Sequence, residues 1–152
     1  MTWDDLIAWW IDKGQAHDAE RARLSLAARL ERSLGDGPEL LLFRTYRALG
    51  RSGPALIPQV YLHSDPYSAR RLGNKPGPLH RQRMDFLMLL PGRARVVIEI
   101  DGQQHYSQNG QAKPALYAQM VIEERELRLA GYEVYRFGGA EFVDKSKCTA
   151  ME

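Results

Sequence analysis

The 152-residue sequence contains a single cysteine, Cys148, which excludes an internal disulfide and a zinc site built from cysteines. It also lacks any run close to the ~20 consecutive apolar residues that a membrane span requires. Its N-terminus carries Asp4 and Asp5, where a secretion signal would carry Lys or Arg. Hydrophobic residues make up 44% and charged residues 26% of the chain, which is typical of folded rather than disordered proteins. We therefore expect a folded, cytoplasmic protein without membrane association.

The net charge of +2 is distributed unevenly along the chain. Residues 1–36 hold five basic and seven acidic side chains, residues 37–97 hold ten and three, and residues 98–152 hold six and nine. The positive middle part indicates a surface for a polyanion. Within it, a segment rich in proline and glycine, typical of a loop, contains the candidate DNA-binding cations Arg70, Arg71, Lys75, Arg81 and Arg83. The alternative is a solvated loop that is rich in arginine by chance.

Apolar residues at helical spacing predict four helices, over residues 3–11, 18–34, 38–49 and 114–130. Asp18 is suited to cap the second of them, and Pro38 to occupy the first turn of the third. Runs of apolar and β-branched residues predict four strands, over residues 57–63, 83–90, 94–101 and 132–137.

From residue 38 onward the predicted order is helix, three strands, helix, strand. This order predicts an α/β fold in which helices flank a mixed sheet. The last strand–helix–strand unit should be a right-handed parallel crossover. We expect a helical extension over residues 1–36, a core domain over residues 37–143 and a polar tail over residues 144–152.

Three carboxylates occur in apolar strands, where an ionised group is costly unless it is paired or bound to a metal. Glu99 and Asp101 lie two residues apart in the run 96–101, so their side chains project from one face of the strand. Asp85 lies in the preceding strand. The simpler interpretation is that Glu99 and Asp101 mark a strand end, followed by an Asp101–Gly102 turn.

The loop between the two strands decides whether these acids meet. If residues 91–93 form a three-residue loop, Leu90 pairs with Ala94, and counting outward pairs Asp85 with Glu99 on one face. A two-residue loop would place Asp85 on the opposite face. The three-residue register gathers Asp85, Glu99 and Asp101 into an acidic cluster, and oxygen ligands select Mg²⁺ or Mn²⁺.

This pattern resembles the PD-(D/E)XK nuclease superfamily, and most closely its branch of very-short-patch-repair-like endonucleases and their uncharacterised bacterial relatives. Three stretches carry the resemblance: residues 83–86 (RMDF), 99–105 (EIDGQQH) and 129–137 (LAGYEVYRF). It covers about residues 38–140. The resemblance implies a restriction-endonuclease-like core of order αβββαβ.

The resemblance also implies metal-dependent hydrolysis of phosphodiester bonds. Asp85 and Glu99 match the metal-binding acids of the family, and the Ile100 carbonyl is the expected third ligand, with Mg²⁺ or Mn²⁺ as the cofactor. Glu39 lies on the helix before the first strand, where many members carry an accessory acid.

Position 101 departs from the family pattern, since most members carry Lys there to position or activate the attacking water. Asp101 would either bind a second ion, accept the proton of the water or hold a neighbouring donor. Gln103 and His105 are candidates for the missing function, because His105 follows the acidic strand closely and suits proton transfer.

Two functions follow from these residues. The first is a Mg²⁺-dependent endodeoxyribonuclease acting on DNA, in repair or phage defence. The alternative is a decayed nuclease fold that serves as a nucleic-acid-binding or protein-interaction module. Residues 1–36 are a candidate surface for a protein partner or for self-association.

Overall fold

The computed structural model describes residues 1–50, 53–61, 83–102, 107–108 and 111–142. Its helices are α1 (Trp3–Asp12), α2 (Ala19–Glu31), α3 (Pro38–Leu49) and α5 (Pro114–Leu129). Its main strands are β1 (Ile57–Tyr61), β2 (Arg83–Leu89), β3 (Arg95–Asp101) and β6 (Tyr132–Gly138). The predicted α/β order of helices and strands is confirmed. None of these helices is both long enough and apolar enough to span a membrane.

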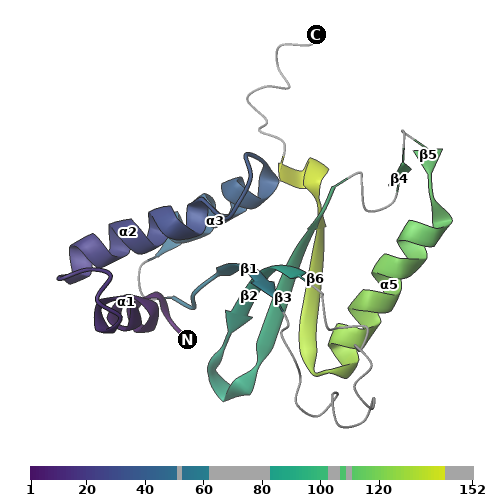
Figure 1. The fold of residues 1–152 in the computed structure, drawn as a ribbon. Helices are drawn as coiled ribbons and strands as arrows, with labels where there is room; N and C mark the ends of the chain where they lie inside the picture. The colour runs from purple at the N-terminus through teal and green to yellow at the C-terminus, as the bar shows by residue number, and fades with distance from the viewer. Residues whose placement is uncertain (51–52, 62–82, 103–106, 109–110, 143–152) are drawn as a thin grey trace.

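The four main strands form one mixed sheet in the order β1-β2-β3-β6. Neighbouring strands are antiparallel except β3 and β6, which are parallel as the sequence predicts. In Figure 1, α1, α2 and α3 lie on one side of this sheet and α5 lies on the other. The sequence did not predict the small hairpin of β4 (Ser107–Gln108) and β5 (Gln111–Ala112) that precedes α5.

Local signals in the sequence explain where the helices begin. Thr2 and Asp5 form a reciprocal capping box at α1, and Asp18 accepts the Arg21 N–H at the start of α2, as predicted. The second helix ends at Glu31 rather than at residue 34. There the backbone tightens into three-residue turns, in which the Leu34 N–H donates to the Glu31 carbonyl.

Two apolar cores cover the two faces of the sheet. The first lies under the N-terminal helices and includes Trp3, Leu34, Phe43, Leu56, Phe86 and Ile100. The second lies under α5 and consists of Met84, Val97, Leu127 and Val134. Burial on both faces explains why β3 is an almost continuous apolar run.

The N-terminal segment is built into the same structure. The Met1 amino group donates to the Leu89 carbonyl at 2.6 Å, and the Trp3 N–H donates to the Gly53 carbonyl at 3.2 Å. The Trp3 ring packs edge-on against Phe43, with centroids 5.9 Å apart. Residues 1–36 thus share a core with the sheet, while the boundary at residue 36 stays a prediction.

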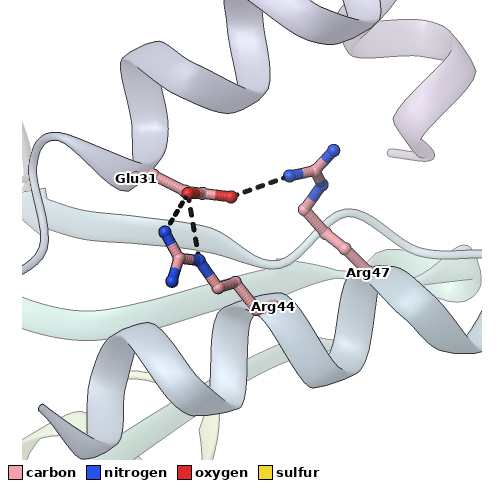
Figure 2. Close-up of polar contacts among 3 residues, drawn as sticks. All are labelled: Glu31, Arg44 and Arg47. Carbon is pink, nitrogen blue, oxygen red and sulfur yellow. Dashed lines mark hydrogen bonds and ion pairs between the residues drawn. The ribbon is translucent and has the colours of Figure 1, made fainter.

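An ion-pair network fastens α2 to α3. Glu31 accepts hydrogen bonds from Arg44 at 2.8 and 3.1 Å and from Arg47 at 3.0 Å (Figure 2). The Arg47 guanidinium also lies 5.9 Å from the Trp3 ring centroid. One carboxylate therefore links the two helices at the edge of the first core.

Candidate functional site

The loop of the β2–β3 hairpin has the predicted length. It is a 3-10 turn, η2 (Pro91–Arg93), in which Gly92 and Arg93 take positive φ angles of 72° and 66°. The Leu90 N–H donates to the Ala94 carbonyl at 2.9 Å across it. The three-residue register, which had to hold for the acids to meet, is confirmed.

Asp85 and Glu99 stand opposite each other at the far end of this hairpin. The backbone pairing of β2 with β3 runs as far as Phe86 and Ile98, so the next residues along the register are Asp85 and Glu99, and the charge of Asp85 raises the pKa of Glu99. There Asp85 Oδ2 accepts the Ile100 N–H at 2.8 Å, so a side chain takes over the role of a backbone carbonyl. Asp85 is thereby anchored to β3.

The alternation of side chains between the two faces of the sheet is interrupted in β2 at Asp85. Met84 packs in the core under α5 and Phe86 in the core under α3, although regular alternation would put both on one face. In β1, Gln59 lies between Pro58 and Val60, which pair with Phe86 and Met84 on either side of Asp85, and it has a φ of 54°. This paired irregularity resembles a bulge, which typically re-aims one side chain. It leaves Asp85 buried, with its carboxylate directed toward β3.

Glu99 is buried in the same place, with 7% of its surface exposed. Its Oε1 atom has no hydrogen-bond partner among the described residues. Burial raises the pKa of Glu99 to about 8, and the charges of Asp85, Asp101 and Glu123 add to the effect, while Arg136 opposes it. Glu99 therefore holds a proton at neutral pH in the protein alone.

Asp101 ends β3 and is held by Arg136 of β6. Arg136 Nε donates to Oδ2 at 2.9 Å, and Nη2 donates to Oδ1 at 2.6 Å. The two side chains are only 16% and 15% exposed. In the parallel register Arg136 is the partner of Glu99, so its cation lies beside both acids of β3.

Glu39 lies in the first turn of α3, as predicted. It accepts a hydrogen bond from Gln59 Nε2 at 2.8 Å. Because Gln59 lies between the two residues of β1 that pair on either side of Asp85, the structure brings the helix acid to the sheet beside the candidate site.

Of the remaining predicted residues, only Arg83 lies within the described part of the chain. Arg83 is exposed at the start of β2, two residues before Asp85. The other predicted residues lie outside the described part of the chain: Arg70, Arg71, Lys75, Arg81, Gln103 and His105.

A pocket of about 800 Å³ adjoins Asp101 at the end of β3, while Asp85 and Glu99 are not among the residues that line it. Asp101 lies in its wall, together with Pro38, Lys113, Tyr117, Met120 and Gly139. A Cβ atom at Gly139 would lie 3.4 Å from the Asp101 carbonyl oxygen, which is an ordinary van der Waals contact. The pocket gives solvent and ligands a path to the end of β3.

Arg136 is a site residue that the sequence reasoning missed. A hairpin loop fixes an antiparallel register, whereas the 16-residue helix α5 between β3 and β6 fixes none. The available signal was periodicity: Arg136 follows the buried Val134 by two residues, which places an arginine on an inward-facing position of the last strand.

No group of three or more His, Cys, Asp and Glu side chains is arranged to hold a metal ion within the described ranges. The structure brings Asp85 and Glu99 together and pairs Asp101 with Arg136. No protein-family model, curated protein or solved structure matches this chain. The interpretation of the site therefore rests on its geometry.

Proposed function

We propose that this chain is a Mg²⁺- or Mn²⁺-dependent endonuclease that hydrolyses phosphodiester bonds of DNA on a restriction-endonuclease-like core. One observation carries the proposal: two buried carboxylates face each other, and Glu99 Oε1 has no hydrogen-bond partner in the described structure. A buried polar atom without a partner calls for an explanation, such as an ion.

A hard divalent cation fits these residues. Two carboxylates that are buried together repel each other when both are ionised. The raised pKa of Glu99 favours its protonated form, which relieves this repulsion. A cation that replaces this proton would satisfy Oε1 and balance both charges. Ligands made only of oxygen favour Mg²⁺ or Mn²⁺ over softer metals.

Each residue of the site has a distinct part in this proposal. Asp85 and Glu99, with the Ile100 carbonyl, would hold the ion, which supplies a polarised phosphate and a water of lowered pKa. The Ile100 N–H donates to Asp85 Oδ2, and this bond fixes the orientation of the whole Asp85 carboxylate. Glu39 sets the position of Gln59 at the irregularity beside Asp85.

The topology supports the same proposal. The order helix, three-strand meander, helix, strand is that of the nuclease superfamily that the sequence resembles. The resemblance implies acids on the second and third strands and on the preceding helix, and Asp85, Glu99 and Glu39 lie on β2, β3 and α3. DNA is the proposed partner because of the cationic middle part of the chain. A cytoplasmic role in repair or phage defence belongs to the same proposal.

A second candidate is a decayed nuclease fold that binds nucleic acid or protein without cleaving. The observation that favours it is the ion pair of Asp101 with Arg136, because the position that carries the cation in most family members here carries an acid.

Plasmid cleavage separates the two candidates. Purified protein is incubated with supercoiled plasmid in Mg²⁺, Mn²⁺ or EDTA. We expect nicked and linear DNA with either metal and none in EDTA. Asp85→Asn and Glu99→Gln should each abolish cleavage, while Glu133→Gln, at an exposed glutamate of β6, should leave it unchanged. A wild-type protein that binds plasmid without cutting it would support the binding module, and equal cleavage by Glu99→Gln would disprove the site.

A further inference from the structure

The site lacks a cation at the position where the resemblance expects one. Asp101 stands two residues after Glu99, and its carboxylate cannot replace an ammonium group. The structure supplies a positive charge from the neighbouring strand instead. Arg136 reaches Asp101 with two hydrogen bonds, from a register position directly beside Glu99.

Arg136 has more N–H donors than the two that bind Asp101 in the described structure. A guanidinium carries five N–H donors in a rigid plane. Two of the five bind Asp101 in the described structure. The remaining donors match the geometry of a phosphate, which arginine binds in a bidentate manner.

The chemistry of arginine limits its role. A guanidinium stays protonated at every workable pH, so it neither takes nor gives the proton of the attacking water. Its contribution is to neutralise charge that develops on the phosphate. Preorganised donors of this kind act strongly where water is largely excluded, and Arg136 is only 16% exposed.

We infer that Arg136 contacts the scissile phosphate, and that Asp101 is a positioning residue that holds the guanidinium in place. This inference rests on the proposed nuclease function. It assigns the missing cation to β6 rather than to β3, and it gives Asp101 the third of its three expected roles, that of holding a neighbouring donor. The competing explanation is that the ion pair only ties β3 to β6.

The test must separate charge from structure. The double variant Asp101→Asn/Arg136→Gln keeps two neutral groups that can hydrogen-bond across the strands, while it removes the cation. We expect it to fold and to bind Mn²⁺ with unchanged affinity. Its kcat on duplex DNA should fall by roughly 10²–10³, as when one donor to a transition-state oxyanion is removed, with little change in KM.

Chemical rescue provides the second arm. Arg136→Ala should lose activity to a similar extent, and added guanidinium ion should restore at least part of the lost kcat. Arg128→Ala is the control, because Arg128 is another arginine of the α5–β6 unit, and it bonds to Glu124 and to the Val134 carbonyl. Its activity should stay near that of the wild type and should not respond to guanidinium.

The outcomes are distinct. If the wild type cleaves DNA and the double variant keeps its kcat, or a folded Arg136→Ala ignores guanidinium, the inference is wrong while the nuclease proposal stands. If Mn²⁺ affinity falls along with kcat in the double variant, Asp101 acts at the metal and the inference is also wrong. A wild-type protein that cleaves nothing overturns both proposals together.

Discussion

Asp85 and Glu99 face each other as buried carboxylates, yet their hydrogen bonding differs. Asp85 accepts the Ile100 N–H at 2.8 Å, whereas Glu99 Oε1 has no partner in the described part of the chain. Asp85 therefore supports the fold as well as the site. Glu99 opposes folding whenever it is ionised without a bound metal ion.

This difference predicts opposite effects of mutation on stability. Asp85→Ala leaves the buried Ile100 N–H unpaired and should lower the free energy of unfolding by about 1–3 kcal/mol. Asp85→Asn keeps an acceptor oxygen and should cost less. Glu99→Gln should leave stability unchanged or raise it at pH 8.5 in EDTA. Urea denaturation of the three variants measures the differences, and a Glu99→Gln variant less stable than Asp85→Ala would contradict the geometry.

The raised pKa of Glu99 predicts how stability varies with pH. Because the pKa rises from 4.5 to about 8 on folding, the folded state binds the extra proton between these values. The stability due to protonated Glu99 is fully present below pH 4.5 and is lost as the pH rises through 8. Each pH unit within this window costs at most about 1.4 kcal/mol.

Subtracting the unfolding free energy of Glu99→Gln from that of the wild type isolates this contribution, because both proteins contain the other titrating groups. We expect the difference in unfolding free energy to move against the wild type from pH 5 to pH 8 in EDTA and then to level off. A difference that does not vary with pH would mean that Glu99 is ionised, with an ordinary pKa, in the folded protein.

Divalent cations should compensate for this loss. At pH 8, Mg²⁺ or Mn²⁺ at a hundred times its dissociation constant should stabilise the wild type by about 2.7 kcal/mol. The affinity should increase from pH 6 to pH 8, because the ion competes with the proton on Glu99. A thermal melt with and without metal measures the effect. An equal metal-induced shift in Glu99→Gln would place the ion elsewhere.

The sequence predicts half of the site for a physical reason. The short loop of residues 91–93 leaves few registers, and the apolar face selects one of them, so the meeting of Asp85 with Glu99 could be counted in advance. The contact of Asp101 with Arg136 depends on how helix α5 returns the chain to the sheet. That return is set by packing of Leu127 and Val134, which periodicity alone does not fix.

The positive φ of Gln59 also could not be predicted from the sequence. Pro58 in β1 gives no sign that the next residue, Gln59, takes a positive φ. The Gln59 side chain donates to Glu39 of α3, a tertiary contact that the local sequence does not specify. Tertiary contacts here override the regular alternation on which strand prediction relies.

The Glu31 network predicts a salt-sensitive link between helices α2 and α3. Glu31→Gln weakens an exposed contact with Arg44 and a partly buried contact with Arg47, and should lower the free energy of unfolding by about 1 kcal/mol. For a chain of this size that corresponds to a melting temperature lower by about 2–4 °C. The loss should shrink in 1 M NaCl.

The matched control is Asp12→Asn, which removes a contact with Lys13 at an aspartate whose side chain is 74% exposed. It should change the melting temperature little, because exposed ion pairs contribute little. If the two variants melt alike, the Glu31 cluster shown in Figure 2 does not stabilise the fold.

The cationic segment outside the described residues predicts how binding to DNA depends on salt. The catalytically silent Glu99→Gln background allows duplex binding to be measured with Mg²⁺ present. Each phosphate contact that is lost reduces the slope of log affinity against log salt by about 0.9. Replacing Arg70 and Arg71 with Ala should therefore lower the slope by up to about two, since each arginine neutralises at most one phosphate.

Replacing Arg29 and Arg32 of the α2 end with Ala changes the net charge equally and should leave the slope unchanged, because these arginines lie outside the positively charged middle part of the chain. Equal slopes in the two double variants would mean that the effect follows net charge alone, and that DNA does not contact residues 70 and 71.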